Sequence, residues 1–313
     1  MSDTPLQNGA APKGGLPPQT TRVSNLAHFL TRNARRLHDQ PALIWGEARW
    51  SWAELDARVS ACAAGLRARY GVSKGDRVLV QAQNSNQMFE SMLACFRLGA
   101  VWVPTNFRQS PDEVAFLAQS SGAQVMICGA EFPDHAAACT GIRHHLTIGG
   151  GGDDFEALLA EHMGETVANQ AVDHSDPCWF FFTSGTTGRP KGVVYHHRGA
   201  YLSATANVIS WRMVLHPVYL TIVPLFHCNG WTHTWMLPAV AGTLVCCRDI
   251  TAKAIYDAIA DEGVTHFGGA PIVLNTMINA PESDRRAFSH TVEVFTAGAP
   301  PPAATLAAFE PLG

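Results

Sequence analysis

The sequence predicts an α/β protein of two alternating α/β subdomains, each with a mostly parallel sheet covered by helices. Short runs of β-branched and aromatic residues alternate with longer segments of helical periodicity from about residue 26 onward. Strands that alternate with helices of this length are typical of parallel sheets buried on both faces. With 313 residues, 47% of them hydrophobic, the chain suffices for one large domain or two ordinary ones.

Caps and breakers mark the elements of the first half. Ser51–Glu54 and Ser110–Glu113 have the S-x-x-E form of a capping box, so each predicts the start of a helix. Another helix is expected from about Ser85 and ends at Gly99, since glycine commonly terminates helices. The strands expected between these helices span residues 41–45, 76–80, 101–103 and 123–128.

The second half repeats the alternation. A helix is expected from His197 to about Arg212, and Thr251 is expected to cap another. The expected strands span residues 179–182, 193–195, 220–227, 242–247, 264–267 and 292–295. We expect residues 1–21 to be a disordered tail, 22–175 the first subdomain with a glycine-rich connector at 149–152, and 176–313 a second, incomplete subdomain.

Composition argues against several function classes. The net charge of −4, with no basic block, disfavours nucleic acid as a partner. The longest apolar run, 235–247, is too short to be a transmembrane segment, and no secretory pattern opens the chain. The eight cysteines form no C-x-x-C pair and are interpreted as buried small hydrophobes in a reducing compartment. We therefore expect a soluble cytoplasmic protein.

The most informative stretch is Phe180–Gly192, with the sequence FFFTSGTTGRPKG. Its glycines allow a tight turn whose free N–H groups form an anion-binding nest, and its hydroxyls and one ammonium add donors. This predicts a polyphosphate cradle, whereas a surface loop of turn-forming residues is the alternative for any short run of this kind. The P-loop pattern is excluded because Pro190 precedes Lys191 and Gly192 follows it.

The stretch resembles the phosphate loop of the adenylate-forming (AMP-binding) superfamily, which includes acyl-CoA synthetases, peptide-synthetase adenylation domains and beetle luciferases. Three further segments match in the family's order. Pro224–Trp231 is similar to the P-L-F-H-x-x-G/A-W segment of acyl-CoA synthetases, and Thr265–Pro271 to a mainly structural T-x-x-x-G-x-P turn. Thr296–Pro302 is similar to a small-residue motif, with Ala297 in place of a usual glycine. The resemblance covers nearly the whole chain.

The resemblance implies an ATP-dependent carboxylic acid–CoA ligase for a short- or medium-chain fatty acid or an aryl acid. It implies ATP, Mg²⁺ and CoA as cofactors and co-substrates, Lys191 and His227 as catalytic residues, and Thr183 as a magnesium ligand. The implied phosphate-binding residues are Thr183, Ser184, Gly185, Thr186, Thr187, Gly188 and Lys191. The implied acyl and adenine pocket contains His227, Asn229, Gly230, Trp231, Gly298, Ala299 and Pro300.

The sequence departs from the family pattern at its end. Gly313 precedes the Tyr-Gly-x-Thr-Glu motif, the hinge and the C-terminal domain that the family carries. We therefore expect these 313 residues alone to be an N-terminal fragment with little or no catalysis. Two alternatives stay open, a catalytically inactive nucleotide-binding or interaction module and an adenylation domain for another acid. A homodimer also stays open.

Overall fold

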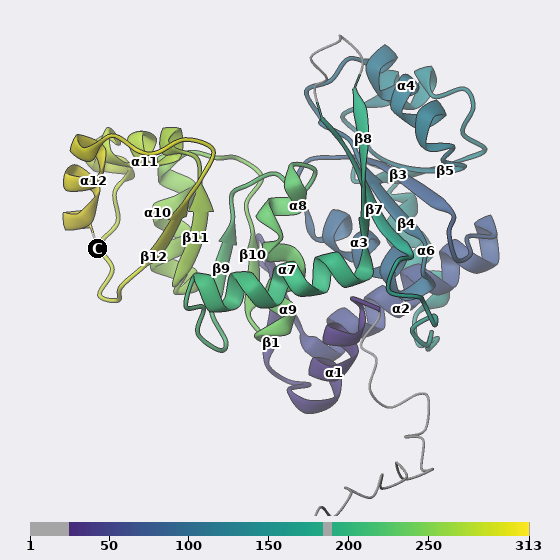
Figure 1. Ribbon diagram of the computed structural model, residues 1–313, viewed down its shortest axis with the longest axis horizontal. Helices are drawn as coiled ribbons and strands as arrows, with labels where there is room; N and C mark the ends of the chain where they lie inside the picture. Colours follow the sequence, from purple (N-terminus) through teal and green to yellow (C-terminus); the bar gives the residue numbers. More distant parts are fainter. Residues whose placement is uncertain (1–24, 184–189, 313) are drawn as a thin grey trace, which may run out of the picture.

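Two six-stranded sheets organise the chain in this computed structural model, which describes residues 25–183 and 190–312 (Figure 1). Helices pack on the faces of both sheets, and nearly all neighbouring strands are parallel, as expected for alternating α/β sequences. The expected disordered tail and residues 184–189 of the expected phosphate loop lie outside the described residues.

The first sheet has the strand order β12-β11-β9-β10-β1-β2. Its strands are parallel except for the β1–β2 hairpin. Their bounds are Glu293–Thr296 (β12), His266–Gly269 (β11), Val218–Thr221 (β9), Thr243–Cys246 (β10), Pro41–Trp45 (β1) and Ala48–Ser51 (β2).

The second sheet has the order β6-β5-β3-β4-β7-β8, and β7–β8 is its antiparallel pair. The bounds are His144–Ile148 (β6), Val125–Gly129 (β5), Arg77–Gln81 (β3), Val101–Pro104 (β4), Pro177–Thr183 (β7) and Lys191–His196 (β8).

The sheets do not divide the chain at the expected boundary between residues 175 and 176. Strand β1 comes from the first half but pairs with β10, with Leu43 opposite Leu244. Strand β7 comes from the second half but pairs with β4, with Trp102 opposite Trp179. Each half of the chain therefore contributes strands to both sheets.

The expected helix signals are present. Both capping boxes form, at Ser51 and Ser110, and Gly99 ends its helix in the left-handed conformation. The helices are α1 (His28–Arg36), α2 (Trp52–Tyr70), α3 (Asn86–Leu98), α4 (Pro111–Ser121), α5 (Pro133–Ala138), α6 (Asp154–His162), α7 (His197–Ser210), α8 (Cys228–Trp231), α9 (His233–Ala239), α10 (Ala252–Glu262), α11 (Pro271–Ile278) and α12 (Ala303–Phe309), with short 3₁₀ turns at Glu282–Asp284 and Glu310–Leu312.

The strand expected at 220–227 is wrong in its extent, because β9 ends at Thr221. The side chain of Asn84 forms hydrogen bonds with backbone groups at and just beyond the ends of β9 and β10. Its amide nitrogen donates to the carbonyls of Thr221 at 3.3 Å and Cys247 at 3.3 Å, and its oxygen accepts from the Leu225 N–H at 2.8 Å. Since Pro224 has no N–H to donate to a ladder, the chain turns here at the carboxyl end of the sheet.

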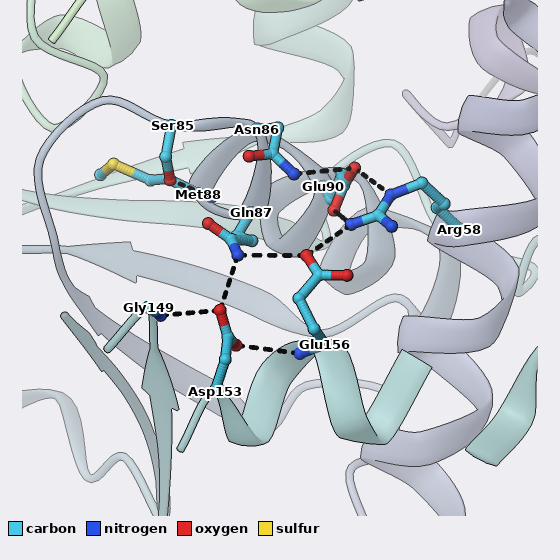
Figure 2. A network of polar contacts seen from close by, with 9 residues as sticks. All are labelled: Arg58, Ser85, Asn86, Gln87, Met88, Glu90, Gly149, Asp153 and Glu156. Carbon is cyan, nitrogen blue, oxygen red and sulfur yellow. Dashed lines mark hydrogen bonds and ion pairs between the residues drawn. The ribbon is translucent and has the colours of Figure 1, made fainter. Parts of the chain in front are cut away.

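A buried polar network joins α6 to α2 and α3 (Figure 2). Arg58 donates two hydrogen bonds to the carboxylate of Glu90, at 2.6 and 2.9 Å, and one to Glu156 at 2.7 Å. The Gln87 amide bridges Glu156 and Asp153, both at 3.1 Å. Because Glu90 is fully buried, this network fixes the packing of three helices beside the second sheet.

Candidate active site

The two ends of the expected phosphate loop are held by one antiparallel ladder. Thr183 is the last residue of β7 and Lys191 the first of β8, and the two are cross-strand partners. The Thr183 hydroxyl lies 3.5 Å from the Lys191 carbonyl oxygen, and the Lys191 side chain is exposed. Gly192 lies beneath the ring of Phe182, where an added Cβ would be 3.3 Å from Cε1. The ladder thus fixes the backbone of Lys191 directly opposite Thr183, with its side chain exposed.

A pocket of about 580 Å³ lies beside this ladder and is lined by residues from both sheets. Thr183 and Pro190 reach it from the ends of the loop, and His227 reaches it from the segment after β9. Phe226 also lines it and packs edge-on against Phe107, with ring centroids 5.6 Å apart. Two of the sequence-predicted motifs, far apart in the chain, therefore meet at one pocket.

Sequence reasoning missed the pocket residues that follow β4. Thr105, Asn106 and Arg108 line the pocket together with the loop ends. The guanidinium of Arg108 lies over the Phe107 ring, 4.7 Å from its centroid, and adds a positive charge. The available signal was their position directly after a parallel strand, because ligands bind outside the carboxyl ends of such strands.

The segment from His227 to Thr232 has an unusual backbone. Cys228, Trp231 and Thr232 have φ values of 44°, 57° and 68°, in the left-handed region that side chains disfavour. Each such residue costs on the order of 1 to 3 kcal/mol, so the surrounding structure must hold it. The Asn207 side chain on α7 donates a hydrogen bond to the Thr232 hydroxyl. The side chain of Asn229 lies outside the described residues.

Trp231 lies away from the pocket and against β11. A Cβ added at Gly268 would lie 3.3 Å from Trp231 Cε3, 2.9 Å from the Tyr219 hydroxyl and 3.5 Å from His233 Cε1. Three rings therefore approach the β11 backbone where glycine provides no side chain. Burial lowers the pKa of His233 to about 3, so its imidazole is neutral near pH 7.

The residues of the third motif lie at the end of the first sheet. Gly298, Ala299 and Pro300 follow β12 and are exposed, with Gly298 at a φ of 90°. They share the carboxyl edge of the sheet with the end of β11, but none lines the pocket beside His227. The structure therefore brings Thr183 close to His227 but leaves the third motif separate from that pair.

The described residues contain no group of three or more His, Cys, Asp or Glu side chains that could hold a metal ion. The hydroxyl of Thr183 and the nearby Lys191 carbonyl are oxygen donors of the kind that Mg²⁺ accepts. A magnesium ion bound mainly through substrate phosphates needs only one or two protein oxygens. The donor set at the loop base thus fits such an ion, without forming a protein cage for it.

A model of the AMP-binding enzyme family matches residues 30–313, almost the entire chain. The chain belongs to the AMP-binding enzyme family. The match extends over both sheets, including the β7–β8 ladder and the His227 segment.

Curated relatives of this family member are named CoA ligases. The chain is 34% identical to an acetate/butyrate–CoA ligase of Arabidopsis thaliana, over 89% of this chain and 53% of the relative. It is 33% identical to a trans-cinnamate:CoA ligase of Petunia hybrida, over 91% of this chain and 55% of the relative. The chain therefore spans about half the length of the curated relatives it matches.

Solved structures of other family members have the same fold. The inhibitor-bound N-terminal domain of FACL13 from Mycobacterium tuberculosis aligns with a TM-score of 0.84 at 26% identity, covering 92% of this chain and 73% of that one. The O-succinylbenzoate–CoA synthetase of Bacillus subtilis in complex with AMP aligns with a TM-score of 0.78 at 25% identity, covering 91% and 71%.

No helix among the described residues combines the length and the apolar character needed to cross a bilayer.

Proposed function

We propose that the whole protein is an AMP-forming carboxylic acid–CoA ligase. It joins an acid to ATP, releases pyrophosphate and transfers the acyl group from the acyl-adenylate to CoA. The observation that carries the proposal is the meeting of Thr183, Pro190 and His227 at one pocket. Membership of the AMP-binding family and the CoA-ligase names of the curated relatives support it.

In the first step, an oxygen of the acid carboxylate attacks the α-phosphorus of ATP, and pyrophosphate leaves. Little covalent chemistry falls to the protein, which must hold the attacking oxygen in line and stabilise charge on the leaving group. Lys191 provides a mobile positive charge for the leaving phosphates, and the loop from Thr183 to Gly188 provides N–H and hydroxyl donors. When bound beside Thr183, Mg²⁺ neutralises phosphate charge.

His227 is the proposed catalytic residue on the acid side. Its exposed ring lines the pocket that also contains Thr183, so it can donate a hydrogen bond where carboxylate and α-phosphate meet. Trp231, with Asn229 and Gly230, is proposed to wall the acyl group. Gly298, Ala299 and Pro300 are proposed to pack against the adenine and acyl groups. The acid is proposed to be a short- or medium-chain fatty acid or an aryl acid.

The cytoplasm is the proposed location. All eight cysteines are free thiols, which suits a reducing compartment, although the Arabidopsis and Petunia relatives are named peroxisomal. A homodimer is the proposed assembly if any forms. Fluorescence microscopy of a tagged protein and analytical ultracentrifugation test these two points.

The test of the proposed function is thioester formation by the full-length protein. The protein is incubated with ATP, Mg²⁺, CoA and acids from acetate to long-chain and aryl acids, and acyl-CoA is measured by mass spectrometry. The proposal expects acyl-CoA from one group of acids. A folded protein that binds ATP but forms no acyl-CoA with any acid would instead favour the nucleotide-binding module. An acyl-adenylate without transfer to CoA would favour an adenylation domain.

A further inference from the structure

The two faces of the first sheet have different chemistry. Strand register places Leu220, Phe267 and Val294 in one row, and they belong to an aliphatic core packed against α10. Because side chains alternate along a strand, Tyr219, Gly268 and Phe295 point to the opposite face.

That opposite face is covered by aromatic and imidazole rings. Helix α7 runs from the end of β8 toward β12, where Trp211 stacks on Phe295 with ring centroids 4.9 Å apart (Figure 1). The ring of His233 lies 4.6 Å from Trp211 and 4.5 Å from Tyr219. These four rings, Trp211, Tyr219, His233 and Phe295, form what we call the ring layer. The layer fills the space between α7, α9 and the sheet.

Two buried polar atoms beside this layer lack partners among the described residues. They are His233 Nε2 and the Thr221 hydroxyl, and their residues are 1% and 2% exposed. Thr221 follows Leu220 on β9 and therefore shares the face of Tyr219. Because nearly all buried polar atoms in proteins are hydrogen-bonded, two unpaired atoms on one face require an explanation. A ligand that supplies the missing partner is such an explanation.

The hydrogen-bonding role of His233 Nε2 follows from the other ring nitrogen. Nδ1 lies 3.0 Å from the carbonyl oxygen of Gly230 and 2.8 Å from the Tyr219 hydroxyl. A carbonyl can only accept, so the Gly230 contact assigns the proton to Nδ1. In the neutral ring, Nε2 is then an acceptor. Its missing partner is a donor, such as a hydroxyl or an amide N–H.

The position of the imidazole connects it with the proposed acid pocket. His227 and Trp231 belong to one segment, and Trp231 and His233 both approach Gly268. If the proposed placement holds, with the carboxylate at His227 and the acyl group beside Trp231, His233 is the imidazole that approaches the same glycine as Trp231. A long alkyl chain would have to separate the stacked rings of the layer, whereas a short acid would end there.

We propose that His233 is a specificity-determining residue, and that its Nε2 selects a short acid carrying a hydroxyl or amide N–H beyond the carboxylate. Thr221 is the second polar group available to such an acid. This inference rests on the proposed ligase function and on the placement of the acid beside Trp231. It names the substrate class as short polar-substituted acids rather than plain alkyl acids.

The test compares matched acids, butyrate with 3-hydroxybutyrate and with 4-hydroxybutyrate, in pyrophosphate–ATP exchange by the full-length protein. The wild type is expected to prefer one hydroxy acid in kcat/KM by at least about tenfold, because an acceptor left unpaired disfavours the plain acid. His233→Phe keeps an aromatic ring but removes Nε2, and it should reduce this ratio to about one. His233→Gln retains an acceptor and should restore part of the ratio.

His266→Phe is the matched control, since His266 is a second buried imidazole, on β11, that also stacks on Phe295, with its Nδ1 2.7 Å from the Thr265 hydroxyl. It is expected to keep the wild-type ratio. A readout independent of turnover is the ¹⁵N signal of His233 Nε2, which should shift when the hydroxy acid binds and stay unchanged with butyrate. Because this signal is measured in the wild type, it tests the role of His233 even if His233→Phe does not fold.

The outcomes separate the two proposals. Exchange with butyrate and both hydroxy acids at equal kcat/KM, together with an unchanged His233 signal, would overturn the role of His233 and leave the ligase function intact. Exchange with no acid at all would reject both the ligase function and the inference that rests on it.

Discussion

Thr183 and Lys191 face each other across the β7–β8 ladder, with the Thr183 hydroxyl 3.5 Å from the Lys191 carbonyl oxygen. One pair of cross-strand residues thereby fixes both ends of the proposed phosphate loop. The same ladder continues into Phe181 and Phe182, which line the pocket with His227. Strand pairing therefore fixes the backbones of Thr183 and Lys191 beside the pocket that His227 also lines.

Lys191→Ala should slow formation of the acyl-adenylate. Loss of one preorganised charge-stabilising group costs on the order of 3 kcal/mol in the barrier, or roughly a hundredfold in rate. The affinity for the acid should change little, because the ammonium serves the leaving phosphates. Single-turnover measurement of adenylate formation over a range of acid concentrations checks this. Lys253→Ala, at an exposed ion pair on α10, is the control without expected effect. Equal losses in rate and acid affinity would contradict the assigned role.

His227→Ala should lower kcat/KM for the acid by on the order of tenfold to a thousandfold, in line with the loss of a positioned donor at the reacting carboxylate. Steady-state kinetics with varied acid at saturating ATP measure it. The matched control is His38→Ala, because His38 is an exposed histidine whose Nδ1 lies 2.9 Å from Asp39 Oδ1 on the surface. An effect of the same size in both variants would argue that His227 has no special position.

Arg58→Ala should destabilise the fold more than any surface ion-pair variant. It leaves the fully buried Glu90 without its charged partner, which typically costs about 3 to 5 kcal/mol (Figure 2). Arg49→Ala, which breaks the exposed pair with Glu262, should cost less than about 1 kcal/mol. Urea denaturation of both variants provides the comparison, and similar midpoints would refute the difference.

The effect of Arg58→Ala should also depend on pH. Burial raises the pKa of Glu90, and hydrogen bonds from Arg58 oppose that rise. Without Arg58 the folded-state pKa of Glu90 rises further above its unfolded value, so the folded state retains a proton that the unfolded state loses. The variant should therefore lose stability as pH rises through this pKa and recover part of it in acid. Denaturation midpoints between pH 5 and 8 test this, and a pH-independent difference would contradict it.

In the wild type, the buried His197 should make the folded state less stable as the pH falls. Burial lowers its pKa to about 4, and its Nδ1 accepts a hydrogen bond from the Leu26 N–H at 3.3 Å. In the unfolded state His197 binds a proton near pH 6.5, whereas in the folded state it stays neutral down to about pH 4. The free energy of unfolding should therefore fall as pH drops from about 6.5 to about 4. The loss is on the order of 3 kcal/mol. His197→Gln should reduce the slope, with His233 contributing part of what remains. An unchanged pH dependence of stability in His197→Gln would contradict the role assigned to His197.

Elements that depend on residues close together in the chain could be predicted from the sequence, whereas features that depend on residues far apart could not. The boxes at Ser51 and Ser110 formed because cap and partner lie three residues apart and need nothing else. The end of β9 was missed because Asn84, more than a hundred residues away, accepts and donates the hydrogen bonds there. Strand β6 and helix α6 were missed as well, although Asp153 caps α6 locally by accepting a hydrogen bond from the Glu156 N–H.

The candidate site shows the same division. Lys191 and His227 could be proposed as site residues from sequence because each lies in a continuous motif. Arg108 and His233 were missed because their positions depend on tertiary structure: Arg108 lines the same pocket as Thr183 and His227, and the His233 ring lies 4.6 Å from the Trp211 ring. A single sequence contains no pattern that links such residues before the sheets are assembled.

Carboxylate-dependent exchange of labelled pyrophosphate into ATP tests the central claim most directly, because it reports the adenylation step alone. The measurement uses the full-length protein with Mg²⁺ and the acid panel. The account predicts exchange with one group of acids and none when the acid is left out. No exchange with any acid, from a folded protein, would contradict the ligase function.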